Sequence, residues 1–485
     1  MSFIGNAPAA IPTSFQAVQA DSFNGNGSTT NFTLSRQITN LYDIEVLVDN
    51  VQQSPYDGSY SVNGTTITFS SAPGSGTNNI YIVYRDHPIT SIQPKGDLTL
   101  EANLNVDGTV YANATLARDG GSDATINGVT PTSDNLMGRN RIINGAMMID
   151  QRNAGASITV NSNTGTQFGV DRFLVQGTSS EGVFTAQQLS ATPPTGFKNY
   201  VRIETTTASA SPASGSLYAM SQIIEGFNIA DLGFGAAGAS TVTFSFWIRS
   251  SLTGTFSGSL KNGNAYNRSY PFTYTISAAN TWEYKTVTVA GDTSGTWQTG
   301  NLGGLIVYWD LGCGSSLLST ANSWQGANYN GVTGSTRLIS TLNATMDITG
   351  VQLEAGSVAT SFERRPFGTE LQLCQRYYEK SYALGTVPGT DTVTGLCQSL
   401  NGTDGNQVAG IRFLVPKRAT PTGLFWSKSG TASSLSTTGY ANAPNTGSWS
   451  TMGDPSEFGF RCIVGTGGLS NGTAYTWHYT ASAEL

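Results

Sequence analysis

The side chains that most often carry out catalysis are scarce in this sequence. It has two histidines in 485 residues. His87 lies in an Asp-His-Pro turn, and His478 stands between two aromatic residues of an apolar stretch. A Ser-His-Asp triad also needs a nucleophile on a sharp turn, and no Gly-x-Ser-x-Gly motif is present. We therefore expect a solvated turn at His87, a neutral buried histidine at His478, and no catalytic histidine.

The cysteines and carboxylates indicate no cofactor either. The four cysteines show no Cys-x-x-Cys spacing, so we expect free thiols and no metal site. Asp391 and Asp404 offer oxygen atoms of the kind that Ca²⁺ prefers, but without the spacing of a known calcium loop, which favours a solvated turn. Glycoside hydrolysis needs only two carboxylates at a set separation, so weak glycosidase activity stays open. The expectation is a protein that is not an enzyme.

Aromatic side chains in polar loops point to a different chemistry, the binding of sugars. A sugar ring presents an apolar C–H face to an aromatic ring and its hydroxyl groups to amides and carboxylates. Such residues occur together in the last hundred positions, and the predicted receptor-binding residues are Trp426, Tyr440, Trp449, Asp404 and Asn406. Aromatic residues at strand ends are more often core residues, and that alternative stays open for Trp426.

The composition indicates that β-strands position these side chains. Charged residues make up 11% of the chain, against about 25% in an average soluble domain, and 57 residues are glycine. Long amphipathic helices are therefore disfavoured, whereas 38% hydrophobic residues suffice for several cores. The net charge of −7, without a Lys/Arg cluster, argues against nucleic acid as a partner. We also expect no secretory signal and no membrane span, because no apolar run approaches about 20 residues.

Turn residues and changes of pattern divide the chain into six parts. The predicted parts are an N-terminal arm (1–14), a small β-sandwich module (15–90), a trimeric β-stem or linker (91–134), a jelly-roll-like β-sandwich (135–368), a helix (369–384) and a C-terminal β-sandwich tip (385–485). In the second part, Asn63-Gly64 between alternating apolar residues predicts a hairpin turn. In the third, the alternating stretch 98–111 is too short to bury itself, which favours pairing among three identical chains, or else a strand pair against a neighbouring domain.

The larger sandwich and the helix follow from their own patterns. Gly/Ser/Asn loops separate strands in 135–368 without a repeat of 20–25 residues, so a jelly roll is favoured over a parallel β-helix. Residues 369–380 have helical spacing with Thr369 as the expected N-cap. Leu373, Tyr377 and Tyr378 on this helix are the predicted trimer-interface residues, and Cys374 is expected to be a small buried side chain.

Several segments are similar to one known family. The tail fibres of tailed bacteriophages, of the T7-like type and from phages of cyanobacteria and marine bacteria, resemble this chain at 140–147, 151–152, 170–173, 222–226, 244–250, 350–356, 373–378 and 477–485. The most specific of these stretches is Leu373-Cys374-Gln375-Arg376-Tyr377-Tyr378. Residues 15–85 separately resemble the small β module at the virion end of many phage fibres. The stretch Gln222-Ile223-Ile224-Glu225 departs from the usual Gln-Arg-Ile-Glu.

The resemblance implies an elongated homotrimer in the virion tail, assembled in the host cytoplasm. It would dock on a tail adaptor or nozzle protein by its N-terminal module and contact a host surface glycan or lipopolysaccharide by its distal domains. The tip loops of the family vary, so no receptor residue carries over from it. Two alternatives stay open, a polysaccharide-degrading tail enzyme and a passive structural fibre or head decoration.

Overall fold

A computed structural model describes the chain as two units, Met1–Tyr111 and Ala112–Leu485. The described residues are 20–38, 40–85, 138–400, 407–437, 445–446, 452–463 and 473–485. The predicted arm (1–14) and the predicted stem (91–134) lie outside them. Each unit is described by itself below.

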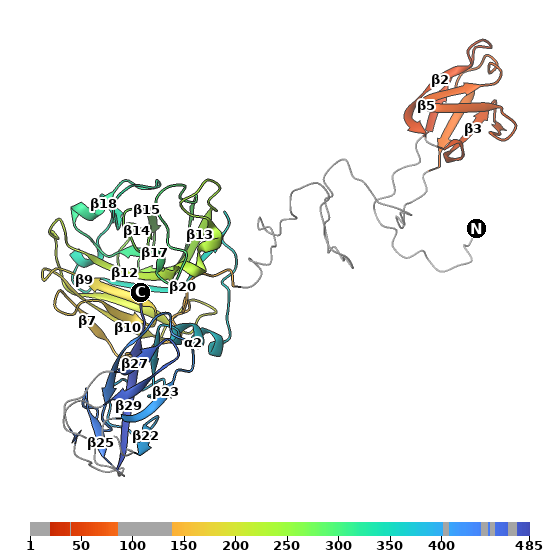
Figure 1. Cartoon of the computed structure of the whole chain (residues 1–485). Coiled ribbons are helices and arrows are strands. Elements are labelled where there is room, and N and C mark those ends of the chain that lie inside the picture. The colour runs from red at the N-terminus through yellow and green to blue at the C-terminus, as the bar shows by residue number, and fades with distance from the viewer. Residues whose placement is uncertain are drawn as a thin grey trace, which may run out of the picture. The chain divides into compact units, whose positions relative to one another are not determined.

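The first unit contains a small β-sandwich (Figure 1). Its strands are β1 (Ala20–Phe23), β2 (Asn31–Ile38), β3 (Ile44–Val48), β4 (Val51–Gln53), β5 (Tyr60–Phe69) and β6 (Ile80–Tyr84). One sheet has the order β1-β6-β3-β4, and β2 pairs with β5 in another. Apolar residues from both sheets, such as Val46, Ile67 and Ile82, are fully buried in a common core. The predicted small sandwich is confirmed.

The predicted hairpin at Asn63-Gly64 is wrong. These two residues lie inside the continuous ten-residue strand β5. Gly64 has a φ of +61° and stands opposite Ile38, where the register with β2 is irregular. A β-bulge and a hairpin turn can both require a positive φ. The Asn-Gly pair therefore predicted the positive φ correctly, but the chain does not reverse direction there.

The second unit begins with a two-layered sandwich of two six-stranded antiparallel sheets (Figure 1). Sheet I has the order β16-β13-β20-β11-β10-β7, and sheet II has the order β15-β14-β17-β12-β9-β8. The strands are β7 (Ile158–Val160), β8 (Gln167–Val170), β9 (Phe173–Gly177), β10 (Val183–Leu189), β11 (Tyr200–Thr207), β12 (Tyr218–Glu225), β13 (Val242–Ser250), β14 (Gly254–Asn262), β15 (Ser269–Ile276), β16 (Glu283–Val289), β17 (Gly303–Asp310) and β20 (Thr345–Ala355), with the short parallel pair β18 (Leu318–Ser319) and β19 (Gly331–Val332).

Alternation along the strands separates the core from the outer faces. On β13, Phe244, Phe246 and Ile248 are fully buried in the core between the sheets. Trp247 and Arg249, each next to Ile248, point to the outer face of sheet I, because successive side chains of a strand face opposite ways. The predicted jelly-roll-like sandwich in a mostly β chain is confirmed.

A short helix and a C-terminal β module complete the second unit. These elements are α2 (Phe367–Gln375), β21 (Tyr378–Lys380), β22 (Cys397–Leu400), β23 (Gln407–Arg412), β24 (Thr422–Trp426), β25 (Leu435–Thr437), β26 (Asn445–Thr446), β27 (Met452–Ser456), β28 (Gly459–Ile463) and β29 (Ala474–Ser482). The strand β29 pairs with β21, β22, β24 and β25, and β23-β28-β27 forms another sheet. Phe425, Phe460 and Trp477 are buried in the core of this module.

The helix is shorter than its sequence pattern predicts. It starts at Phe367 after Pro366, without a side-chain cap, and ends at Gln375, so the expected N-cap at Thr369 is wrong. Tyr377 and Tyr378 lie beyond the helix. The reason is tertiary, because Tyr378 pairs with Ser482 in β29 and strand pairing replaces the local helical preference.

The thiols agree with the expectation from the sequence. All four cysteines are free, and Cys374 is buried, with 1% of its surface exposed. In the part of the chain that the structure describes, no helix has the length and hydropathy needed to cross a membrane.

Candidate functional site

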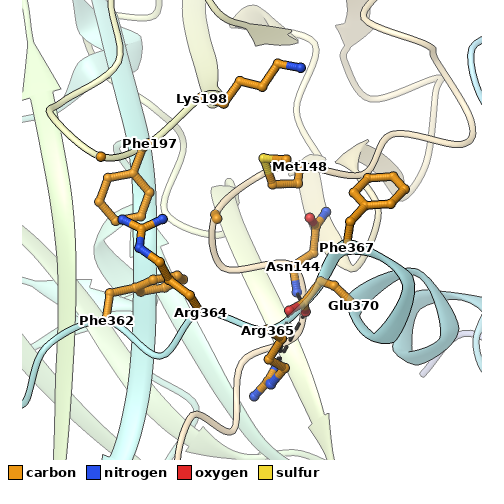
Figure 2. Close-up of a pocket in the computed structure, with 11 residues that line it drawn as sticks. Asn144, Met148, Phe197, Lys198, Phe362, Arg364, Arg365, Phe367 and Glu370 are labelled. Carbon is orange, nitrogen blue, oxygen red and sulfur yellow. Dashed lines mark hydrogen bonds and ion pairs between the residues drawn. The ribbon is translucent and has the colours of Figure 1, made fainter.

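An aromatic groove lies against the outer face of sheet I, where the chain enters β11 and leaves β20. It consists of two adjoining clefts of about 260 and 450 Å³ that share Phe197, Phe362 and Arg364. The first cleft also takes in Phe367 at the start of α2 (Figure 2). The second cleft continues over the strand residues Trp247 and Tyr284.

Two pairs of aromatic rings line this groove. Phe197 and Phe362 meet edge to face with their centroids 5.1 Å apart, and Trp247 and Tyr284 lie opposite each other on β13 and β16 with centroids 5.4 Å apart. Gly350 allows the two pairs to approach. Its φ is +62°, and a Cβ atom there would lie 2.7 Å from Phe197 and 3.0 Å from Trp247. Any other residue at this position would displace the rings.

Two cations of the first cleft form no ion pair among the described residues. The guanidinium carbon of Arg364 lies 4.8 Å from the ring centroid of Phe197 and 5.7 Å from that of Phe362 (Figure 2). Lys198 is exposed at the rim. The adjacent carboxylate of Glu363 is directed elsewhere, because it accepts hydrogen bonds of 2.8 and 2.6 Å from two backbone N–H groups near the start of the sandwich.

A third cation of the first cleft is fully engaged. Arg365 donates to the carbonyls of Asn140 and Ile142, and its Nη1 lies 3.3 Å from Glu370 Oε1. Glu370 also accepts a 2.5 Å hydrogen bond from the backbone N–H of Asn144. These bonds hold the 362–370 segment in place as one wall of the cleft. They also neutralise the single carboxylate that lines it.

The chemistry available in the groove is that of binding. Aromatic rings offer apolar faces, while Arg364, Lys198 and the side chains of Thr360 and Ser361 offer polar contacts. Neither a histidine nor a cysteine is present among the residues that line the two clefts. A small number of polar groups around apolar walls is typical of sites that orient a ligand.

A second polar region, the junction, joins the sandwich to the C-terminal module and is buried. Arg172, with 1% of its side chain exposed, pairs with Glu484 and lies 3.5 Å from the ring centroid of Tyr377. Arg152 lies 2.9 Å from Glu484 and 3.6 Å from Asp171. Burial raises the pKa of Asp171 to about 6, against the lowering effect of Arg152.

Further ion pairs extend the junction. Glu225 accepts two hydrogen bonds from Arg376, of 2.9 and 2.6 Å, and a third of 2.7 Å from the hydroxyl of Tyr377. Lys417 and Glu379 lie 2.6 Å apart with no exposed side-chain surface on either. Buried charges of this kind are tolerated because each is paired and hydrogen-bonded.

Segments on which the predicted likeness to phage fibres rests meet at this junction. They are 151–152, 170–173, 222–226, 373–378 and 477–485, which contribute Arg152, Arg172, Glu225, Arg376 and Glu484. Contacts within one chain are enough to explain why these positions hold arginine and glutamate. The motifs therefore mark how the modules are joined and leave the ligand unspecified.

The structure describes one of the predicted receptor-binding residues. Trp426 is half-buried on β24, and a Cβ atom on Gly389 would lie 3.0 Å from its ring. The other four lie outside the described residues: Tyr440, Trp449, Asp404 and Asn406. The predicted tip site stays a prediction.

The predicted interface residues have partners within the chain. Tyr377 is fully buried, and Tyr378 has 7% of its surface exposed and stacks on Arg152 at 3.8 Å. Leu373 is half-buried on α2. A single chain does not test an interface between subunits, so this assignment also stays a prediction.

His478 is a buried core histidine, as the sequence predicts. It is fully buried, its Nε2 lies 3.1 Å from the carbonyl of Thr392 and its Nδ1 lies 3.1 Å from the hydroxyl of Ser381. Burial lowers its pKa. His87 lies outside the described residues. Over the described ranges, no three His, Cys, Asp or Glu side chains are grouped as metal ligands, and Asp391 instead lies 3.1 Å from Lys428.

The groove itself escaped prediction from the sequence. Its rings come from separate segments, and Phe197 and Phe362, which meet edge to face, are 165 positions apart, so no local pattern connects them. One signal was available. Arg364 and Arg365 are adjacent, in a chain with only 24 Lys and Arg residues, and stand between Phe362 and Phe367.

Comparisons with known proteins give weak likenesses. No family model matches the chain, and no curated protein matches it. Among solved structures, the enzymatically active domain of bacteriophage CBA120 tailspike protein 4 is 12% identical with a TM-score of 0.23. That match covers 45% of this chain and 21% of the tailspike chain, so this chain spans about a fifth of that protein.

Two further likenesses are to smaller proteins. TmCBM61 in complex with β-1,4-galactotriose is 11% identical with a TM-score of 0.22, covering 45% of this chain and 99% of its own. The family 11 carbohydrate-binding module of Clostridium thermocellum Lic26A-Cel5E is 10% identical with a TM-score of 0.21, covering 40% and 97%. Likenesses at these TM-scores say nothing of what this chain binds.

Proposed function

We propose that this chain is a glycan-binding protein and that the aromatic groove holds the sugar. The observation that carries the proposal is the pair of adjoining clefts in which Gly350 brings two pairs of aromatic rings together. Tyr284 and Phe367, at the two ends of the groove, keep 41% and 47% of their surface exposed. Exposed aromatic rings in a concave site are suited to stacking on the apolar face of a sugar.

The groove favours binding over cleavage. Glycosidases generally use two carboxylic groups flanking the scissile bond. The residues that line the two clefts include one carboxylate, Glu370, which Arg365 and the backbone N–H of Asn144 already engage. A polysaccharide-degrading enzyme is the alternative, and the release of reducing ends from a bound polysaccharide would favour it.

We propose further that the chain is a subunit of a phage tail fibre that reads a glycan on the host surface. The support is the set of motifs that resemble such fibres, together with an N-terminal β-sandwich at the residues that resemble the virion-end module of such fibres. A homotrimer would carry three grooves, so weak individual affinities would add through avidity. Light scattering of the purified protein should give a mass near three chains, and a monomer would contradict the trimer.

The binding experiment uses the full chain on a glycan array, followed by calorimetry with the best ligand. Tyr284→Ala and Phe367→Ala should each weaken binding about five- to tenfold, since loss of a stacking ring costs roughly 1–1.4 kcal/mol. Tyr266→Ala and Phe458→Ala are the matched controls, because these rings are 41% and 56% exposed and lie outside the groove. Both controls should bind as the wild type does.

The same measurement separates the groove from the predicted tip. If Trp449→Ala and Tyr440→Ala abolish binding while the groove variants do not, the receptor site is the tip and the groove assignment is wrong. If no glycan binds at all, the glycan-binding proposal fails. A passive structural fibre would then be favoured.

A further inference from the structure

We infer that the first cleft selects an acidic sugar, one that carries a carboxylate or phosphate group, and that Arg364 binds that group. This inference rests on the proposed glycan binding and names the class of ligand. Three cations and one carboxylate line the cleft, in a protein with a net charge of −7. The local excess of positive charge therefore runs against the overall charge of the chain.

Other arginines on the outer face of sheet I are paired. Arg202 and Arg249 both bind Asp347, at 2.7 and 2.6 Å, across three neighbouring strands. Arg364 and Lys198, at the same face, have no such carboxylate among the described residues. The chain thus neutralises Arg202 and Arg249 beside the groove and leaves Arg364 and Lys198 available.

The setting of Arg364 suits recognition of an anion. Its guanidinium lies beside Phe197 and Phe362, and these contacts restrict its orientation without using its N–H donors (Figure 2). A guanidinium presents a planar fork of donors that matches a carboxylate or a phosphate with two hydrogen bonds. The aromatic rings that line the cleft, Phe197, Phe362 and Phe367, would stack on the sugar ring that carries the anionic group.

The carboxylates near the cleft leave no competing site for a cation. Glu363 accepts hydrogen bonds from two backbone N–H groups. Glu370 accepts hydrogen bonds from Arg365 and from the backbone N–H of Asn144. Both are therefore satisfied before a ligand arrives. A positively charged or amino sugar would meet Arg364 and Lys198 without a compensating acidic side chain.

The test compares matched pairs of oligosaccharides on the full-length protein by calorimetry. One pair is oligogalacturonides against galacto-oligosaccharides of the same length, and the other is mannose oligosaccharides with and without a 6-phosphate. The inference predicts that one acidic member binds at least tenfold more tightly than its neutral partner. The preference should fall as salt rises from 50 to 500 mM, because salt screens charge interactions. The two pairs show whether the group is a carboxylate or a phosphate.

Variants of Arg364 assign the effect to the cleft. Arg364→Gln should reduce the acidic preference about tenfold while any binding of the neutral partner persists, and Arg364→Lys should restore part of it. Arg85→Gln is the control, because it removes the same charge from an exposed arginine of the other unit. Lys198→Gln should have a smaller effect of the same sign.

The outcomes distinguish this inference from the proposed function. Equal binding of acidic and neutral members, or an acidic preference that Arg364→Gln leaves unchanged, overturns the inference and leaves glycan binding standing. Absence of binding to every glycan overturns both. Competition by a single-stranded oligonucleotide stronger than by any acidic glycan would assign the cleft to nucleic acid and overturn the inference as well.

Discussion

The junction and the groove use the same residue types in opposite ways. In the junction, Arg172 is buried, stacked on Tyr377 and paired with Glu484. In the groove, Arg364 is exposed, stacked on Phe197, and has no acidic partner among the described residues. A buried arginine must be matched by the chain itself, because an unpaired buried charge is strongly destabilising. An exposed arginine on an aromatic ring needs no carboxylate from the chain and stays available to an anionic ligand.

This contrast separates residues that build the molecule from residues available for a ligand. Substitutions in the junction should lower stability, and substitutions of the ring and cation side chains that line the groove should change binding at little cost in stability. The four predictions below test this division, from the largest expected effect to the smallest.

The largest effect is expected from breaking the buried pair of Glu379 and Lys417. Glu379→Leu leaves a lysine with no exposed surface and no carboxylate, which should cost about 3–5 kcal/mol in the free energy of unfolding. Denaturant titration measures it. The double variant with Lys417→Met should recover most of the loss. Asp454→Asn, which weakens the exposed pair with Arg461, should cost under about 1 kcal/mol. Equal losses for the two single variants would contradict the division.

Gly350→Ala should affect stability and binding together. An alanine at a φ of +62° costs about 1–2 kcal/mol, and its contact with Phe197 and Trp247 should add about 1 kcal/mol and displace both rings. Gly165→Ala is the control, since its φ is +63° and a Cβ atom there meets nothing within 4 Å. Thermal unfolding and glycan titration of both variants provide the comparison. Unchanged binding in Gly350→Ala would show that the ring arrangement is not needed.

The junction should respond to pH through Asp171. Its pKa rises to about 6 on folding from an ordinary value of 3.8, so the folded state binds this proton more tightly than the unfolded state. Its contribution to stability is therefore present at low pH and is lost as the pH rises through about 6. The free energy of unfolding of wild type relative to Asp171→Asn should fall by on the order of 2 kcal/mol between pH 4 and 7. A difference that stays constant across this range would show that Asp171 does not titrate there.

The smallest effect on stability is expected in the groove. Phe367→Ala removes a ring that is 47% exposed at the first position of α2. It should lower the free energy of unfolding by no more than about 0.5 kcal/mol, measured by denaturant titration. The comparison is Cys374→Asp at the buried face of the same helix, which should be far more damaging because Cys374 is 1% exposed. A large loss of stability in Phe367→Ala would make the ring a packing residue.

The sequence predicted what local patterns can encode. Alternating apolar residues located the strands of both units, as at 244–248, and scarce charge correctly indicated a β protein. The helix prediction was wrong beyond Gln375 because Tyr378 pairs with a strand about a hundred residues later, and no local pattern reveals that pairing. The hairpin predicted at Asn63-Gly64 was wrong because a bulge and a turn can both place a glycine at positive φ.

The candidate site was harder to predict than the fold. The stretch Gln375-Arg376-Tyr377 belongs to the most specific part of the resemblance, yet Arg376 and Tyr377 bind Glu225 inside the chain. The groove combines Phe197, Trp247 and Phe362, which are ordinary residues in their own segments. Their nearness depends on the register of β13 with β20 and on one glycine, and both are properties of the assembled sheet.

The ion pair of Arg172 with Glu484 sets an order of events during synthesis. The two residues are 312 positions apart. At about 5–20 residues per second, a ribosome needs roughly 15–60 s to deliver the carboxylate after the arginine has emerged. Through that interval the arginine lacks this carboxylate partner. This ion pair therefore cannot form before β29 and the residues just after it have been synthesised.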